Sequence, residues 1–341
     1  MNGPRCPIPI SDYPNVLLAH GGGGRLMRDL LQKVFRALFP DSGSHDAALL
    51  SLDSGRVAVT TDAFVVRPRF FPGGSIGSLS VHGTVNDLAT IGARPVALSA
   101  AWILEEGLPM DELWETALAM RDAAAACGVA VVTGDTKVVE RGAADGIYIQ
   151  TTGIGVLVSD EALSPSRIEP GDALVLSGDL GRHGTAVMAA REGLESGIVS
   201  DSAPIHEPVL DLVRSGIPVR CVRDVTRGGL ASVLNELASE SGLGLTIDEA
   251  RVPVDAEVRG FCEILGLDPL YVACEGRFVA VVSAEAADRA VECLRRHPVS
   301  RQATRVGEVR AAPGGRVTMT SRIGVERILD LLSGEQLPRI C

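Results

Sequence analysis

The sequence predicts an α+β protein built from two domains. Its 341 residues exceed the length of about 250–300 residues at which a single hydrophobic core usually stops growing. Strand-like and helix-like segments alternate along the chain, but without the strict βαβ repetition of a single parallel sheet. Residues 159–172 lose apolar periodicity and contain two prolines, which marks a boundary. We therefore expect domains over 1–158 and 159–333, and a flexible tail over 334–341.

The elements of the first domain follow from runs of aliphatic residues and from helical spacing of apolar side chains. In the predicted helix over 110–127, one apolar face is formed by Leu113, Ala117, Met120, Ala124 and Cys127. The expected order is a strand over 56–66, a helix over 75–91, a strand over 95–104, a helix over 110–127 and strands over 129–139 and 146–158.

The second domain repeats a similar order of elements, so we expect another sheet layered with helices. Its expected elements are a strand over 172–178, helices near 183–192, 204–215 and 228–241, a strand over 243–254, a helix over 255–265, a strand over 276–283, a helix over 284–296 and two closing strands.

Charge and composition exclude several classes of protein. A net charge of −11 and a pI near 5.1 argue against binding to nucleic acid or to an anionic membrane, because both need a basic surface. No apolar run is long enough to span a bilayer, and the proline-broken N-terminus lacks the apolar core of a signal peptide. Seven scattered cysteines without a CxxC pair indicate a reduced cytoplasmic protein with neither a disulfide framework nor a thiolate zinc site.

Four consecutive glycines, Gly21, Gly22, Gly23 and Gly24, precede an amphipathic helix in "AHGGGGRLMRDLL". Backbone amides without a neighbouring Cβ can surround phosphate oxygens, and the start of a helix adds partial positive charge. A flexible linker explains the same glycines equally well. The segment is not a Walker A loop, because no GK[ST] follows it.

Acidic residues lie where apolar segments end or turn. Carboxylates at strand ends can hold Mg²⁺, which prefers oxygen ligands and bridges to substrate phosphates. A single aspartate more often caps a helix or turn. Asp87 differs, because "HGTVNDLATIG" would bury it on an apolar helix, where an unpaired charge is costly. The candidate ligands are Asp62, Asp87, Asp135 and Asp224, with Asp46 as a possible fifth.

A second candidate phosphate site is "DVTRGGL" at residues 224–230. The helix that follows uses its leucines and Val233 for the core, which leaves its start free for an anion. A glycine pair that only permits tight packing is the alternative. The candidate contacts in this segment are Asp224, Thr226, Arg227, Gly228 and Gly229.

Lys137 and Glu275 are candidate proton-transfer groups, because such side chains in clefts can have shifted pKa values. Either one alone would more simply be a solvated surface charge.

Cys341 is the last residue, after Pro338 has ended any helix. An extended tail of eight residues reaches about 25 Å, so its thiol could be loaded in one place and presented in another. An accidental exposed thiol would be a liability, and prenylation requires the cysteine fourth from the end.

Together these segments resemble the HypE family of hydrogenase-maturation carbamoyl dehydratases, in the PurM-like (aminoimidazole-ribonucleotide synthetase-like) superfamily. The resemblance covers nearly the whole chain and rests on "AHGGGG", "TTDAFVVRPRFFPGG", "GTVNDLA", "EEGLP", "GDTKVVERG", "TRGGL", "LGLDPLYVA" and "PRIC". The terminal "PRIC" is its most specific part. The family fold implies an N-terminal ferredoxin-like half that forms a dimeric β-barrel with a second protomer, a C-terminal α/β half and hence a homodimer.

The resemblance also implies an activity. The carbamoyltransferase HypF loads a carbamoyl group onto the terminal thiol, here Cys341. ATP with Mg²⁺ then drives dehydration of the thiocarboxamide to a thiocyanate, and the cyanide passes to the HypC–HypD complex for the iron of [NiFe]-hydrogenase. The glycine and aspartate motifs would bind Mg-ATP, and Lys137 and Glu275 would handle the amide and its protons.

Several positions depart from the family pattern, namely His82, Arg182, Val225 and Cys274. None removes a proposed ligand, but Cys274 could change the orientation of Glu275, and Arg182 leaves the role of His183 open. Two other readings remain: another enzyme of the superfamily, such as selenophosphate synthetase or thiamine-monophosphate kinase, and a non-catalytic assembly factor. Neither enzyme explains the terminal thiol, and the aspartate set speaks against the assembly factor.

Overall fold

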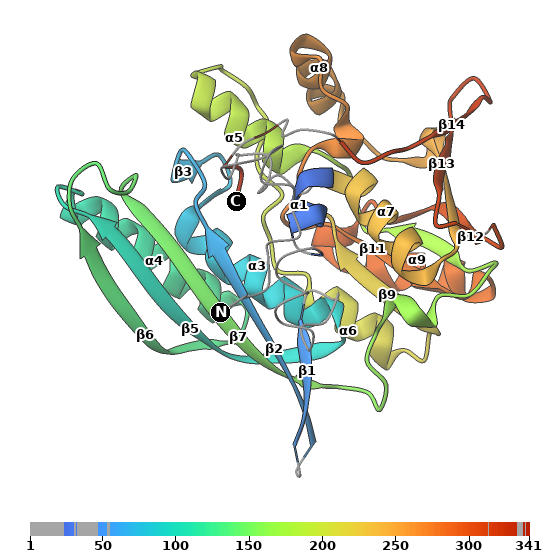
Figure 1. Cartoon of the computed structure of the whole chain (residues 1–341), viewed down its shortest axis with the longest axis horizontal. Coiled ribbons are helices and arrows are strands. Elements are labelled where there is room, and N and C mark those ends of the chain that lie inside the picture. The colour runs from blue at the N-terminus through green and yellow to red at the C-terminus, as the bar shows by residue number, and fades with distance from the viewer. Residues whose placement is uncertain are drawn as a thin grey trace, which may run out of the picture.

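The computed structural model describes residues 24–30, 32, 47–52, 55–312, 314–332, 337 and 339–341. Two β-sheets, each covered by helices, lie side by side in Figure 1. Within the described part of the chain, no helix combines the length and apolar content needed to cross a membrane. The predicted α+β class is confirmed at this level.

The N-terminal sheet has five strands in the order β1-β2-β7-β5-β6, and only the β5–β6 pair is parallel. Along β7, Ile147, Ile149 and Thr151 are buried while Gln150 and Ile154 are exposed, so one face of the sheet packs on helices and the other is open. The strands are β1 (Ala48–Leu52), β2 (Gly55–Phe64), β5 (Ala93–Glu105), β6 (Ala130–Val139) and β7 (Ile147–Leu157). The covering helices are α3 (Ile76–Thr90) and α4 (Met110–Ala126), and the short elements are α1 (Arg25–Leu30), β3 (Phe70–Phe71) and β4 (Gly74–Ser75).

Helix α3 is the central element of this half. It begins at a capping box in which Ser75 and Ser78 exchange side-chain and backbone hydrogen bonds. Two glycines let it lie close to its neighbours: a Cβ at Gly77 would lie 2.2 Å from the Thr116 carbonyl, and one at Gly83 would lie 2.9 Å from the ring of Phe64. This close packing brings α3 directly beneath the end of β2.

The C-terminal sheet has seven strands in the order β14-β13-β10-β12-β8-β11-β9. Helix α7 packs on one face and helices α6 and α9 pack on the other, which gives two aliphatic cores. The strands are β8 (Ala173–Leu176), β9 (Val219–Asp224), β10 (Gly244–Asp248), β11 (Phe278–Val282), β12 (Thr304–Arg310), β13 (Val317–Thr320) and β14 (Glu326–Ile328). The helices are α5 (Arg182–Glu192), α6 (His206–Arg214), α7 (Gly229–Ser241), α8 (Ala256–Leu265) and α9 (Ala287–Arg295).

Most predicted elements are confirmed to within a few residues, and three details differ. The strand predicted over 243–254 is too long, because β10 ends at Asp248, whose carboxylate accepts the Ala250 N–H and starts a 3₁₀ turn. Strands β1, β9 and β14 and the two-residue strands β3 and β4 were not predicted. The described residues form an open five-stranded sheet in the N-terminal half and no closed barrel.

The two halves are joined through α3. The Asn86 side chain donates to the Ala203 carbonyl at 3.1 Å and accepts from the Ile205 N–H at 2.8 Å. It also donates to the Glu275 carbonyl at 3.4 Å. Asn86 and Asp87 are neighbours on α3. These contacts therefore fix the position of Asp87 relative to the loop that carries Glu275.

Candidate active site

Six of the predicted site residues come together where the two halves meet. Asp62 lies near the end of β2, Asp87 lies on α3, Asp224 ends β9, and Cys341 belongs to the C-terminal segment. Each acid in the group shifts the pKa of Arg227, Glu275 or Cys341, so the six residues lie close together. The group, called the Arg227 cluster below, consists of Asp62, Asp87, Asp224, Arg227, Glu275 and Cys341.

Two adjacent loops of the C-terminal sheet build most of the cluster. Strands β9 and β11 are antiparallel neighbours, with Asp224 opposite Phe278. The pairing continues past the strand ends, because the Val225 N–H donates to the Arg277 carbonyl at 2.8 Å and the Cys274 N–H to the Val225 carbonyl at 2.9 Å. Backbone hydrogen bonds between the two loops therefore fix the positions of Asp224 and Glu275.

Arg227 is the cationic centre of the cluster. Its pKa is raised above the usual range, most strongly by Cys341, and further by Asp62, Glu275 and Asp87, although burial acts in the opposite direction. Opposite charges within a few ångströms favour the charged form. A guanidinium that lies among acids in this way is suited to binding an anion, which would take the place of an acidic side chain as its partner.

Glu275 is 3% exposed, and its Oε1 atom has no hydrogen-bond partner among the described residues. Burial raises the pKa of this carboxyl well above its ordinary value, and the charges of Asp224, Asp62 and Asp201 raise it further, while Arg227 lowers it. A carboxyl whose pKa is raised by its surroundings is suited to exchanging a proton with a substrate.

Cys341 reaches the cluster because the end of the chain packs between the two halves, close to β3 and α5 (Figure 1). Ile340 is 2% exposed and belongs to the same hydrophobic core as Phe64 and Phe71. A flexible tail was expected over 334–341, whereas Ile340 lies in this core and Cys341 packs against it. Burial raises the pKa of the Cys341 thiol to about 12, although Arg227 lowers it, so the thiol keeps its proton at neutral pH.

Asp135 and Lys137 lie apart from the Arg227 cluster. They contact each other on β6, and their side chains are 67% and 69% exposed. Asp62 pairs with Thr151, Thr151 with Ala100 and Ala100 with Gly134, the neighbour of Asp135. Three strand spacings, about 14 Å, therefore separate Asp135 from Asp62. Within one chain, Asp135 therefore lies apart from the other predicted metal ligands, because β6 is the far edge of the sheet.

The remaining acids were also tested as a metal site. Asp87 is half-buried on α3 and accepts a hydrogen bond from the Thr60 hydroxyl at 2.8 Å, so its burial is compensated. Across the described ranges, no three His, Cys, Asp or Glu side chains form a group that could by itself hold a metal ion. Asp46 lies outside the described residues.

The glycine predictions have mixed outcomes. Gly229 has a φ of +62°, and a Cβ there would lie 2.5 Å from the Leu270 carbonyl, so tight packing explains it. Its N–H donates to the Thr226 carbonyl, and its contact with a phosphate stays a prediction. Gly228 has a φ of +78° and precedes α7. Gly24 is buried before the six-residue helix α1, and Gly21, Gly22 and Gly23 lie outside the described residues.

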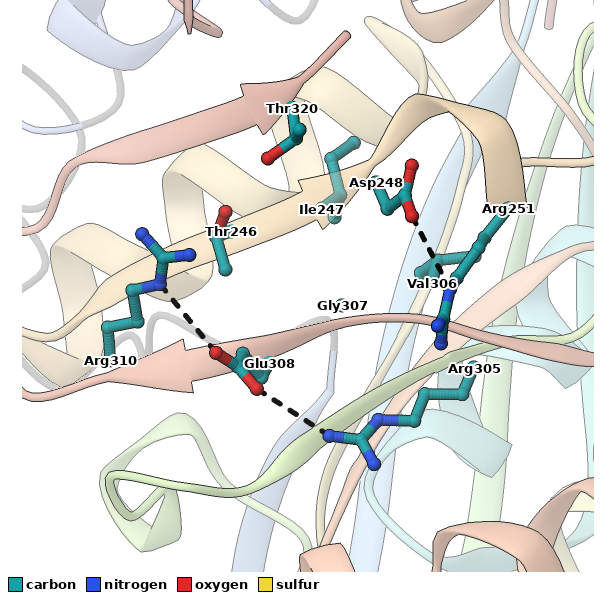
Figure 2. Close-up of a pocket in the computed structure, with 10 residues that line it drawn as sticks. All are labelled: Thr246, Ile247, Asp248, Arg251, Arg305, Val306, Gly307, Glu308, Arg310 and Thr320. Carbon is teal, nitrogen blue, oxygen red and sulfur yellow. Dashed lines mark ion pairs between the residues drawn. The ribbon is translucent and has the colours of Figure 1, made fainter. Parts of the chain in front are cut away.

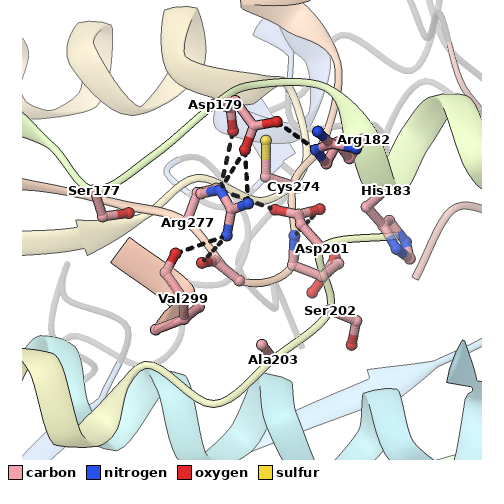
Figure 3. A network of polar contacts seen from close by, with 12 residues as sticks. Ser177, Asp179, Arg182, His183, Asp201, Ser202, Ala203, Cys274, Arg277 and Val299 are labelled. Carbon is pink, nitrogen blue, oxygen red and sulfur yellow. Dashed lines mark hydrogen bonds and ion pairs between the residues drawn. The ribbon is translucent and has the colours of Figure 1, made fainter. Parts of the chain in front are cut away.

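Sequence reasoning missed a polar network beside the cluster, shown in Figure 3. Asp179 accepts hydrogen bonds from Arg182 and Arg277, and the pair of Asp179 with Arg277 measures 2.7 Å. Arg182 also donates to Asp255 at 2.7 Å, so its departure from the family pattern is accommodated by two acids. Arg277 lies 3.8 Å from Asp201, the acid that also accepts from the Glu275 N–H. Only the "GRHG" segment had signalled this region.

The cavity in Figure 2 is a different feature. It has a volume of about 320 Å³ and lies over β10 and β12 of the C-terminal sheet. Arg251 pairs there with Asp248, and Arg305 and Arg310 both pair with Glu308. Each arginine thus has an acidic partner, with Arg310 also paired to Glu326, and none of the lining residues belongs to the Arg227 cluster.

Comparisons with known proteins identify the family. Models of the AIR synthase related protein match residues 44–157 with the N-terminal domain and residues 169–320 with the C-terminal domain. The chain is 48% identical over 330 residues to the carbamoyl dehydratase HypE of Cupriavidus necator, covering 95% of this chain and 94% of that protein. The HypE of Escherichia coli K12 is 42% identical over 337 residues, covering 96% and 99%. The chain belongs to the HypE family.

Solved structures of HypE proteins agree. A HypE complex with ATP superposes with a TM-score of 0.82 at 46% identity, covering 96% of this chain and 100% of that chain. A HypE–HypF complex has a TM-score of 0.84 at 42% identity, covering 89% and 99%. The enzyme called AaThiL, complexed with AMPPCP and TMP, has a TM-score of 0.70 at only 18% identity, which shows a shared PurM-like fold and no more.

Proposed function

We propose that this HypE family member uses ATP to dehydrate a carbamoyl group carried on Cys341 to a thiocyanate, which supplies the cyanide ligands of [NiFe]-hydrogenase iron. The observation that carries this proposal is the position of the thiol, which lies among Arg227, Glu275, Asp62 and Asp224. The names of the relatives, carbamoyl dehydratases, and the ATP complex of a HypE protein support it.

The reaction converts a thiocarboxamide, R–S–C(=O)NH₂, and ATP into R–S–C≡N, ADP and phosphate. The amide oxygen is a poor leaving group until it carries a phosphoryl group, and it then departs with the phosphate while the nitrogen loses its two protons. In this proposal Arg227 binds the negative charge that develops on the phosphoryl oxygens. Glu275 exchanges a proton with the amide nitrogen, and its raised pKa supports this role.

The residues present fit a magnesium ion that is completed by nucleotide. Mg²⁺ usually binds one or two carboxylates together with substrate phosphates, so it needs no three-ligand group from the protein. Asp62 and Asp87 both act on Arg227, and Asp224 acts on Cys341. One or two of these carboxylates, together with nucleotide phosphates, would hold the ion, which would supply neutralisation of phosphate charge when bound.

A homodimer is part of the proposal, because the exposed edge and open face of the N-terminal sheet need a partner. Every residue of β6 except Val139 is exposed, including Val132 at 65% and Val138 at 67%, and Trp114 on α4 is 66% exposed. Unpaired edge strands and large apolar patches are typical of interaction surfaces. A second copy pairing here would cover them and would carry Lys137 and Asp135 within an interface, where they could act on the partner's site.

The other expected partners are HypF, which loads the thiol, and the HypC–HypD complex, which receives the cyanide. A HypE protein is known in complex with HypF. In the docked position the thiol has a pKa of about 12, so it is a poor nucleophile there. We therefore place loading at a position of the tail outside the cluster, in the cytoplasm where free thiols persist.

Mass spectrometry of the C-terminal peptide tests the function. The chain is incubated with HypF, carbamoyl phosphate and ATP, and the peptide should first gain a carbamoyl group and then lose one water in a step that needs ATP. The Cys341→Ala variant should show neither change and should keep its circular dichroism spectrum. A carbamoylated peptide that never loses water with ATP present would reject dehydration and favour the assembly-factor alternative.

A further inference from the structure

His183 stands out because the chemistry proposed above does not use it. It is the second residue of α5 and is fully buried, with the Phe71 ring edge-on at a centroid distance of 5.3 Å. Both ring nitrogens have partners: Nδ1 lies 2.8 Å from the Ser200 hydroxyl, and Nε2 lies 2.9 Å from the Ile340 carbonyl. One buried side chain thus links α5 to the residue before Cys341.

The directions of these hydrogen bonds follow from chemistry. A carbonyl oxygen can only accept, so Nε2 of His183 carries a hydrogen and donates it to Ile340. Burial lowers the pKa of the ring, although Asp201 and the Ile340 carbonyl oppose this, so the imidazole is neutral and its Nδ1 accepts from Ser200. The Ser200 oxygen in turn accepts from the Ser202 N–H at 3.0 Å. The network therefore fixes one tautomer and points one donor at the tail.

The rest of the C-terminal segment is held by backbone hydrogen bonds and by the Arg339 side chain, which donates to the Val65 carbonyl at 3.0 Å and to Asp145 at 2.6 Å. The Val65 N–H donates to the Cys341 carbonyl at 3.1 Å, and the Arg67 N–H donates to the Arg339 carbonyl at 3.2 Å, an antiparallel arrangement. Arg191 bridges the same pair by donating to the carbonyls of Arg67 and Arg339. The carbonyl of Ile340, between these two, is the one to which His183 Nε2 donates.

We propose that His183 is a positioning residue that fixes the register of the C-terminal segment, and thereby holds the Cys341 thiol in the Arg227 cluster. A shift by one residue would place a different carbonyl on His183 and would move the thiol by about 3.3 Å. The proposal rests on the proposed function only in treating Cys341 as the reacting thiol. Loss of the hydrogen bond from His183 to the Ile340 carbonyl should release the tail more often. Release exposes the Cys341 thiol and slows dehydration of its cargo.

The test measures the labelling of Cys341 by iodoacetamide in the full-length protein, without nucleotide or partner. His183→Asn and His183→Gln are matched variants, because the Gln amide reaches the position of Nε2 whereas the Asn amide reaches only that of Nδ1. Losing one hydrogen bond of about 1.4 kcal/mol should raise the released fraction about tenfold. Labelling of Cys341 should therefore be about tenfold faster in the Asn variant and within about threefold of the parent in the Gln variant.

The buried residues Cys221 and Cys274 report on folding in the same digest, and they should stay protected. Unchanged labelling of Cys341 in the Asn variant, or equal acceleration in both variants, would overturn the proposal. Should the Asn variant also expose Cys274, Ser200→Ala takes its place, because it frees the ring to rotate. In the Ser200→Ala variant we expect faster labelling of Cys341 and unchanged labelling of Cys221 and Cys274. Unchanged labelling of Cys341 would contradict the proposed role of His183.

A second readout separates this proposal from the proposed function. Dehydration of pre-carbamoylated protein in a single turnover should slow in the Asn variant and recover in the Gln variant. If the parent protein itself fails to dehydrate its cargo, the proposed function is wrong, while the labelling comparison still decides the role of His183.

Discussion

Replacing Glu275 by Gln should stabilise the protein, and by an amount that grows with pH. The side chain is 3% exposed, Oε1 lacks a partner among the described residues, and three other acids act on it. Its pKa in the folded state is raised well above the ordinary value of 4.5. Glutamine has nearly the same shape, carries no charge and can donate to those acids.

The size of the effect follows from proton linkage. Below pH 4.5 the carboxyl is protonated in both the folded and the unfolded protein, so the two variants should differ little. Above that pH the unfolded chain loses the proton while the folded one keeps it. The free energy of unfolding of the parent then falls, relative to Glu275→Gln, by up to about 1.4 kcal/mol for each pH unit until the raised pKa is passed.

Urea unfolding followed by circular dichroism at pH 5.0, 5.5, 6.0 and 6.5 measures this difference. Titrations of other groups occur in both variants and largely cancel. Glu115→Gln is the control, because Glu115 is exposed on α4 and its replacement should give a small difference at every pH. A gain from Glu275→Gln that stays constant between pH 5.0 and 6.5 would refute the assignment of a buried, protonated carboxyl.

Three further predictions concern the surroundings. Gly229→Ala should cost about 1–3 kcal/mol more in urea unfolding than Gly242→Ala, because both have a positive φ but a Cβ clashes only at Gly229; equal costs would contradict this. Val132→Glu should convert a dimer to a monomer in light scattering, because it places a charge on the exposed edge strand β6, and an unchanged mass would argue against pairing there. Arg227→Met should abolish ATP-dependent dehydration while HypF still carbamoylates Cys341, and Arg227→Lys should keep part of the activity; full activity in the Met variant would exclude a phosphoryl contact.

The sequence was sufficient for most of the fold, because local patterns decide most of the elements. The apolar face of α4 and the aliphatic runs of β5 and β7 have the period of the structure they form. Strand β10 was predicted too long, because one carboxylate, that of Asp248, ends the strand by capping the next turn. Such a local competition does not change the apolar pattern, so periodicity cannot detect it.

The candidate site was predictable in its residue types but not in its geometry. Asp62 and Asp135 both follow apolar runs in similar motifs, yet they lie about 14 Å apart, because strand order in a sheet is independent of chain order. His183 gave no signal of its own, since its partner Ile340 is 157 residues away in the sequence. Contacts of this range depend on how the two halves meet, which no short motif encodes.

In the proposed mechanism the tail leaves the docked position and returns to it, which divides the chemistry of Cys341 between two positions. In the docked position, burial favours neutral forms of the sulfur, so a protonated thiol, a thiocarboxamide or a thiocyanate is accommodated more easily than a thiolate. Under the proposed function, a released tail would restore the ordinary pKa of 9.0, at which the nucleophilic thiolate forms far more readily. Release would therefore favour loading, and docking would favour dehydration of a cargo that is already attached. The hydrogen bond from His183 and the burial of Ile340 act on the balance between these positions without touching the reacting atoms.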